Sequence, residues 1–360
     1  MKILKNLYTL NCLCAAFIFF TQKCFTLHRP AKFLKTQHPF EKELIITDPQ
    51  TLRSAAKDAL LFFEGDCNSL KSKYLDRVGL TPLDAAKTLK WIVKVVDEDK
   101  KSGKFRILDP EFLNKNLKFI KWNGDVLGAK KANIVIPRGP DGGKLKNGRI
   151  KITSYAVFTV DGSRNKTKKF NTALYGYSKQ KPVNKLCKNE KVLFLNDGRG
   201  FKIRPLVWLT HKDAKDALMQ GSIIVRMPNG RRKMFNVHEN REVAENRGGE
   251  SRNRWFFREI LNRKNSRREK LLRIIDHPWA VFAGDLNQLG LGKLIALKYK
   301  NPAKRRDEIR LGVLADTGEA FQNNLYQLDL YAGIFNSRDT FRKELRQLPN
   351  TSQAYFLVKK

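Results

Sequence analysis

From Ile150 onward the sequence is a series of short β-type runs, each closed by a turn signal, and this pattern limits the possible folds most strongly. The runs are 150–160, 192–195, 221–227 and 293–299. The turn signals include Asp161-Gly162, Asn196-Asp197-Gly198 and Asn229-Gly230. Many short strands separated by such turns are typical of β-barrels. The sequence therefore predicts a mainly β fold for this part.

The preceding stretch, residues 45–122, has a helical pattern instead. Three helices are predicted, each beginning at a capping residue followed by proline, and the third is expected to continue through residue 120. The three starts are Asp48-Pro49, Thr81-Pro82 and Asp109-Pro110. Glycines at 139, 142, 143 and 148 mark the change to β character. A charged stretch at 258–273 is predicted to be a helix or a loop.

The amino terminus resembles an export signal. Lys2 and Lys5 precede an apolar run at 7–20, and polar residues follow. Residues 1–26 are therefore predicted to be a signal peptide or, alternatively, a membrane anchor, with the rest in the periplasm or cell envelope. Cys67 and Cys187 follow this segment and either form a disulfide or stay as two thiols.

The net charge predicts anionic partners. The chain has 71 Lys and Arg residues against 35 Asp and Glu residues, a difference of +36. Nucleic acid, an acidic membrane face and an acidic polymer all fit this charge. No zinc-finger spacing or RNA-recognition signature is present, so charge alone does not select nucleic acid. The five histidines have no ligand spacing, which makes a zinc site improbable.

Three aspartates, Asp285, Asp316 and Asp329, lie between apolar neighbours in the last β-rich part. Burial or a nearby like charge raises the pKa of a carboxyl group, and a carboxyl that keeps its proton near neutral pH can act as a general acid. Aspartates in such positions also commonly cap turns, so this pattern alone leaves both roles open.

The spacing of these aspartates resembles the three-aspartate domain of the membrane-bound lytic murein transglycosylase A family. The matching pieces are Asp285 with Leu291-Gly292, Asp316-Thr317-Gly318, and Asp329-Leu330-Tyr331 with Gly333. Upstream, in the same order, Ile152-Thr153-Ser154-Tyr155, Gly162-Ser163-Arg164, Val207-Trp208-Leu209, Gln220-Gly221-Ser222 and Pro228-Asn229-Gly230 resemble further family segments. The loop 319–324 departs from the Gly-rich sequence usual in the family.

The resemblance implies a double-psi β-barrel and a second β-rich domain with a glycan-binding groove between them. It places the barrel at 104–158 and 262–350, the second domain at 159–261, and a helical segment at 27–103. We expect a monomer whose partners are peptidoglycan glycan strands, not nucleic acid, with membrane association only through the N-terminus.

The same resemblance implies a lytic transglycosylase. Such enzymes cleave the β-1,4 bond between N-acetylmuramic acid and N-acetylglucosamine without water, leave a 1,6-anhydro end and need no cofactor or metal. Asp329 is the implied catalytic acid and base, and Asp316 supports it. The implied substrate-binding residues are Asp285, Thr153, Tyr155, Gln220 and Ser222. The alternatives are a non-catalytic peptidoglycan-binding protein on the same scaffold, favoured by the altered loop, and a basic nucleic-acid-binding protein.

Overall fold

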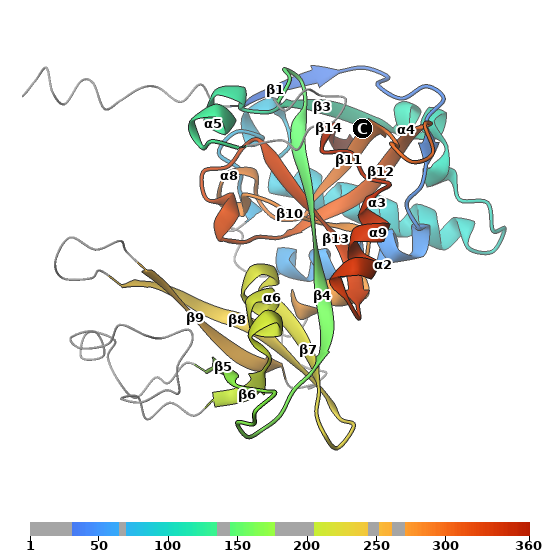
Figure 1. The fold of residues 1–360 in the computed structure, drawn as a ribbon. Coiled ribbons are helices and arrows are strands. Elements are labelled where there is room, and N and C mark those ends of the chain that lie inside the picture. Colours follow the sequence, from blue (N-terminus) through green and yellow to red (C-terminus); the bar gives the residue numbers. More distant parts are fainter. Residues whose placement is uncertain (1–30, 65–69, 135–144, 177–204, 244–251, 261–270) are drawn as a thin grey trace, which may run out of the picture.

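The computed structural model describes residues 31–64, 70–134, 145–176, 205–243, 252–260 and 271–360 (Figure 1). The predicted signal or anchor, the run 192–195, Cys67 and Cys187 lie outside these residues. Within the described part of the chain, no helix is both long and apolar enough to cross a membrane.

Six strands pair in a closed ring, which is a β-barrel. Around the ring the order is β14, β11, β12, β10, β13 and β4, and β4 pairs back with β14. The β10–β12 and β13–β4 pairs are parallel, and the other four are antiparallel. The strands are β4 (Ile150–Asp161), β10 (Val281–Ala283), β11 (Lys293–Lys300), β12 (Asp307–Asp316), β13 (Gln327–Phe335) and β14 (Thr351–Lys359). The mainly β fold is confirmed, β14 extends past the predicted barrel boundary, and the double-psi crossing stays a prediction.

Strands also occur in the stretch predicted to be helical. These are β1 (Lys32–Thr36), β2 (Leu44–Ile45) and β3 (Leu117–Asn123). β3 pairs with both β1 and β14, and β2 pairs with β12. The prediction that the third helix continues through residue 120 is therefore wrong. Buried Leu117 and Phe119 flank exposed Lys118, a two-residue period that suits a strand between two partners.

The three predicted helix starts are confirmed. The Asp48 carboxylate accepts a hydrogen bond from the Thr51 backbone N–H at 2.7 Å. Thr81 and Asp84 form a reciprocal capping box, which satisfies two N–H groups at the helix start. The helices are α2 (Pro49–Leu60), α3 (Pro82–Asp99) and α4 (Pro110–Asn116). Shorter helices elsewhere are η1 (Leu61–Glu64), η3 (Asp76–Val78), η4 (Arg106–Leu108), α5 (Val126–Lys131), η6 (Leu271–Asp276), α8 (Leu286–Leu289), η7 (Glu319–Phe321) and α9 (Arg338–Leu345).

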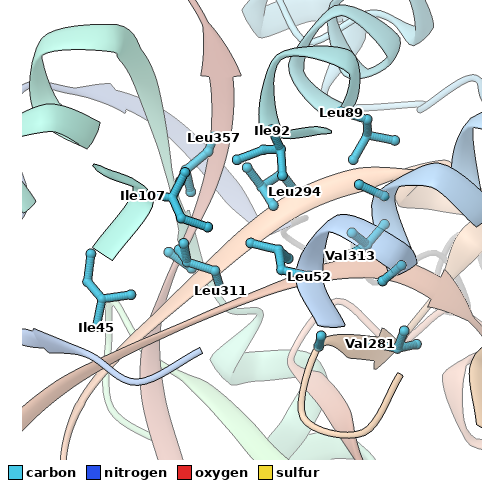
Figure 2. Close-up of a cluster of buried hydrophobic side chains, with 14 of the residues drawn as sticks. Ile45, Leu52, Leu89, Ile92, Ile107, Val281, Leu294, Leu311, Val313 and Leu357 are labelled. Carbon is cyan, nitrogen blue, oxygen red and sulfur yellow. The ribbon is translucent and has the colours of Figure 1, made fainter. Parts of the chain in front are cut away.

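Helices α2 and α3 cover the barrel and share one apolar core with it (Figure 2). Leu52 of α2 and Ile92 of α3 are fully buried and face barrel residues such as Leu294 and Leu311. Burying a leucine side chain contributes roughly 1.5–3 kcal/mol, so this layer fixes α2 against the barrel wall.

A second β unit is joined to the barrel through strand β4. Residues 151–158 of β4 pair with β13, and residues 158–161 pair with β7. The elements of this unit are β5 (Thr172–Tyr175), β6 (Pro205–Leu209), α6 (His211–Gln220), β7 (Ser222–Arg226), β8 (Arg232–Val243) and β9 (Arg252–Ile260). They enclose an apolar core of their own around Val207, Ile223 and Phe257, below the barrel in Figure 1.

The structure corrects one prediction at the end of this unit. Residues 258–260 end strand β9 and are neither helix nor loop. Phe256 and Phe257 are buried there, and their strand pairs with β8 over its whole length, which overrides the charge of the segment. Residues 261–270 of the same predicted segment lie outside the described chain, and residues 271–273 begin the helix η6, as predicted.

The shared core generates a stability prediction. Leu52→Ala should lower the free energy of unfolding by about 2–5 kcal/mol, because it leaves a cavity between α2 and the barrel. Leu83→Ala is the matched control, since Leu83 of α3 is 64% exposed, and it should change stability by less than about 1 kcal/mol. Urea denaturation measures both. Equal effects of the two substitutions would contradict the described packing of α2.

Candidate active site

Two of the three predicted aspartates lie on barrel strands that share one neighbour. Asp316 ends β12 and Asp329 lies within β13. The strand between them is β10, and its Ala283 pairs in register with Asp316 on one side and with Asp329 on the other. Asp329 pairs in turn with Thr153 on β4. Because opposed residues on neighbouring strands share a face, Asp316, Asp329 and Thr153 form one row across four strands.

Asp316 joins this row because β12 contains one extra residue. Phe282 pairs with Leu314, but the next residue, Ala283, pairs with Asp316, so Ala315 is the additional residue. A bulge of this kind re-aims the side chains that follow it. Without it Asp316 would leave the opposite face of the sheet, away from Asp329.

A tyrosine holds the Asp316 carboxylate in place. The Tyr155 hydroxyl donates to Asp316 Oδ2 at 2.6 Å, and the Thr317 backbone N–H donates to Oδ1 at 2.8 Å. The Tyr155 ring lies against the buried ring of Tyr331, with centroids 5.3 Å apart. Both oxygens of Asp316 are therefore engaged, and its orientation is fixed by the wall of the barrel.

Asp329 is held more loosely. The Gln327 amide donates to Asp329 Oδ1 at 3.1 Å and to Thr153 Oγ1 at 2.8 Å. Gln327 lies two residues before Asp329, so both leave the same face of β13. Among the described residues, Asp329 Oδ2 has no hydrogen-bond partner, and the Asp329 side chain is partly exposed. This oxygen is therefore not committed to another described residue.

Burial raises the pKa of both carboxyls. For Asp329 the pKa rises to about 6, because desolvation and the negative charge of Asp316 outweigh the Gln327 hydrogen bond and the positive charge of Lys151. Desolvation also raises the pKa of Asp316, against the lowering effect of the hydrogen bonds from Tyr155 and Thr317. Two carboxyls in one row thus keep protons to a higher pH than exposed aspartates do.

The tyrosines of the site keep their protons. Burial raises the pKa of Tyr155 well above its ordinary value of 10, and the negative charges of Asp316 and Asp329 act in the same direction. Burial likewise raises the pKa of Tyr331. Tyr155 is therefore a neutral hydrogen-bond donor to Asp316 at any pH where the protein works.

Asp285 has a different environment from the other two aspartates. It is 2% exposed and begins α8, where its oxygens accept hydrogen bonds from the Gln288 and Asn324 backbone N–H groups, each at 3.2 Å. These contacts make Asp285 a buried helix cap that fastens the chain near Asn324. The turn-capping alternative describes these contacts, and the substrate-binding role of Asp285 stays a prediction.

Gln220 and Ser222 lie where the second unit joins the barrel. The Gln220 side-chain oxygen accepts a hydrogen bond from the Ala156 backbone N–H at 2.9 Å, so Gln220 fixes the strand directly after Tyr155. Ser222 begins β7 and is partly exposed. In the described part of the chain, neither side chain forms a hydrogen bond with Asp316 or Asp329. Their predicted contact with substrate stays a prediction.

Sequence reasoning missed Gln327 and Lys151. Gln327 bridges Thr153 and Asp329, and Lys151 lowers the pKa of Asp329 through its charge. The two-residue period of a strand was the available signal for Gln327, because position 327 must share the face of Asp329. Lys151 needed the parallel pairing of β4 with β13, which places it beside Gln327 and which no local pattern reveals.

Comparison with known proteins bears on the fold. No protein-family model and no curated protein sequence matches the chain. Among solved structures, the membrane-bound lytic murein transglycosylase of Agrobacterium tumefaciens matches with a TM-score of 0.56 at 12% identity, over 91% of this chain and 98% of that one. Two further matches are MltA from Neisseria gonorrhoeae (TM-score 0.55, 12% identity, 91% and 93% of the two chains) and E. coli MltA with bound chitohexaose (TM-score 0.52, 12% identity, 91% and 94%).

The chain has the MltA fold. The resemblance predicted from the motifs is thereby confirmed at the level of architecture, along nearly the whole of the chain. The MltA fold alone does not assign a reaction at this identity, so the activity rests on the site just described.

The raised pKa of Asp329 generates a prediction about stability. The folded state holds this proton to about pH 6, whereas an unfolded aspartate releases it near pH 4. The stabilising contribution is therefore complete below pH 4 and is lost as the pH rises through 6. The free energy of unfolding of the wild-type protein should therefore fall between about pH 4 and pH 7. In Asp329→Asn this fall should be smaller by roughly 1–3 kcal/mol, because the amide does not titrate.

Urea denaturation at both pH values measures this difference. Asp339→Asn is the control, because the Asp339 side chain is 84% exposed, and it should keep the wild-type pH dependence. An unchanged pH dependence in Asp329→Asn would show that Asp329 ionises as freely as an exposed carboxyl.

Proposed function

We propose that the protein is a peptidoglycan lytic transglycosylase with Asp329 as its single catalytic acid and base. The observation that carries the proposal is the Asp329 carboxyl, partly exposed, with one free oxygen and a pKa of about 6. The MltA fold supports it, and E. coli MltA with that fold has been solved with bound chitohexaose. A groove between the barrel and the second β unit is the proposed place of the glycan strand.

In the first step, protonated Asp329 acts as the acid. Its proton passes from the free oxygen to the glycosidic oxygen between N-acetylmuramic acid and N-acetylglucosamine, and the bond from that oxygen to the anomeric carbon breaks. A pKa near the working pH suits this role, because the group is partly protonated and also gives up its proton readily.

In the second step, the Asp329 carboxylate acts as the base. It removes the proton of the muramoyl 6-hydroxyl, and that oxygen attacks the anomeric carbon of the same sugar to close the 1,6-anhydro ring. The attacking group belongs to the substrate, so its effective concentration is high and no water need be activated. Asp329 ends protonated, ready for the next bond.

Asp316 supports both steps from its place in the row. Its negative charge raises the pKa of Asp329, in addition to the larger effect of burial. Because Tyr155 and Thr317 occupy both Asp316 oxygens, Asp316 is better suited to an electrostatic role than to proton transfer. Thr153 and Tyr155 border Asp329 and Asp316 and are proposed to contact the sugar, in line with their predicted role.

Two alternatives use the same structure differently. A non-catalytic peptidoglycan-binding protein would keep the scaffold, and the unusual loop 319–324 favours it. A nucleic-acid-binding protein would use the net charge of +36. The position proposed for the protein is the periplasm or cell envelope, where peptidoglycan lies, and this location argues against nucleic acid.

The central test removes the exchangeable proton. Asp329→Asn should lower the rate of anhydro-muropeptide release from purified peptidoglycan by at least about a thousandfold, because the amide can neither donate nor accept the proton. Chromatography with mass spectrometry identifies the anhydro ends, and thermal melting checks the fold. Asp339→Asn should act at the wild-type rate. Wild-type protein that sediments with peptidoglycan but releases no product would support the binding-protein alternative.

A second test measures how neighbouring charges change the pKa of Asp329. The rate should fall as the pH rises through the pKa of Asp329, because the deprotonated group cannot start the reaction. Lys151→Met removes a positive charge that lowers this pKa, so it should move the alkaline limb of the pH profile to higher pH. Asp316→Asn removes a negative charge that raises the pKa of Asp329, so it should move the same limb to lower pH.

Each shift should be less than about one pH unit, because both charges act through a partly solvated site. Initial rates of muropeptide release at a series of pH values measure them. Shifts in the same direction would contradict the assignment of the limb to Asp329.

A further inference from the structure

A pocket separate from the candidate active site lies between α2 and the end of η6. Its volume is about 500 Å³, within the range of small-molecule sites. The lining groups that matter most here are Gln50, Ser54, Lys57 and Asp58 from α2, and Asp276 and His277 from the end of η6. None of them belongs to the row of Asp316 and Asp329.

Three of these residues form a stripe along α2. Gln50, Ser54 and Lys57 are separated by four and three positions, so they share one face of the helix and span roughly two turns, about 10 Å. Among the described residues, their side chains have no hydrogen bond or ion pair, and neither has the exposed carboxylate of Asp276. The pocket therefore presents an amide, a hydroxyl, an ammonium and a carboxylate, all available to a ligand.

One wall of the pocket is fixed. His277 is 5% exposed, and its Nε2 lies 2.8 Å from Asp58 Oδ2. This contact joins η6 to α2, so the two sides of the pocket are held at a set distance. A site held open in this way loses little conformational entropy when a ligand binds.

The charges of the pocket are balanced, which is unusual for this chain. Arg53 is ion-paired with Asp97 and Asp58 lies against His277, so Lys57 and Asp276 supply the one positive and the one negative charge left for a ligand, although the whole chain carries +36. A simple anion would be repelled by the carboxylates and a simple cation by the basic groups. A ligand that carries both an ammonium and a carboxylate satisfies both sets.

A chain of contacts leads from the pocket to the candidate active site. The Tyr331 hydroxyl donates to the Ile275 carbonyl at 3.3 Å, and Asp276 follows directly. On the other side, the Tyr331 ring packs against Tyr155, which holds Asp316. The pocket and the candidate active site are therefore linked through Tyr331.

We propose that this pocket binds a zwitterionic amino-acid-type group, with its carboxylate on Lys57, its ammonium on Asp276, and Gln50 and Ser54 as neutral hydrogen-bonding partners. The source of such a group is a peptide branch of the glycan substrate that ends in a free amino and a free carboxyl group. This source rests on the proposed function, whereas the charge pattern of the ligand follows from the pocket alone.

Three small probes that differ only in the charged groups they carry test the charge pattern with the full chain. Diaminopimelate carries both kinds of charged group, pimelate carries only the carboxylates, and 1,5-diaminopentane carries only the ammonium groups. By isothermal titration calorimetry, diaminopimelate should bind at least about tenfold more tightly than either of the other two. Equal binding of all three, or no binding of diaminopimelate at tens of millimolar, would overturn the proposal.

Two variants locate the binding. Lys57→Met and Asp276→Asn should each weaken diaminopimelate binding by about tenfold, because each removes one of the two charged contacts. Lys94→Met, on the exposed face of α3, is the control and should bind as wild type does, since the Lys94 side chain is 74% exposed. Unchanged binding in both pocket variants would refute the assignment of the pocket.

The test separates this proposal from the catalytic one. Asp329→Asn should bind diaminopimelate as tightly as wild type, because Asp329 does not line the pocket. If wild-type protein binds diaminopimelate but releases no anhydro-muropeptide, then the pocket stands and the proposed reaction fails. If it releases product but does not bind diaminopimelate, then the reaction stands and the pocket proposal fails.

Discussion

The candidate site depends on the register of three barrel strands around β10. Ala283 is a small residue with an aspartate opposite it on each side, and the extra residue Ala315 turns Asp316 to the face that Asp329 occupies. Backbone pairing along these strands fixes which residues lie opposite one another, so it sets the spacing of the two carboxyls. The side-chain hydrogen bonds from Tyr155 and Gln327 only choose the orientation of groups that the sheet has already brought together.

The raised pKa values of the two site carboxyls are opposite to the effect expected from the positive charge of the chain. A net charge of +36 favours ionised carboxylates everywhere on the surface. Desolvation overcomes this tendency at Asp329 and Asp316, even with Lys151 close to Asp329. In the proposed function, the basic surface and the proton-holding site have separate tasks: the surface would attract an anionic polymer over a distance, and the site would act on the bound sugar.

Local signals in the sequence were sufficient for part of this structure. Caps such as Thr81 and turn pairs such as Asn229-Gly230 involve neighbours in the chain, so the helix starts and several strands could be predicted. The strand Leu117–Asn123 could not be predicted, because its apolar residues fit both a helical and a strand spacing. Only the pairing with β14 makes this segment a strand. The motif resemblance brought Asp316 and Asp329 into view as the catalytic pair and assigned Asp285 to substrate binding. It could not show the hydrogen bond that Asp285 accepts from the backbone N–H of Asn324, a residue far along the chain.

Strand β4 belongs to both β units without a break. Hinges in multi-part enzymes usually lie in loops that absorb changes of backbone angle, whereas a continuous paired strand can only twist or bend slightly. The Arg338–Asp216 ion pair between α9 and α6 joins the two units at a second place. The proposed groove between them is thus expected to keep a nearly constant width and not to close like a lid. In the proposed function, the glycan strand would have to lie down into a cleft that is already open, which suits a long chain.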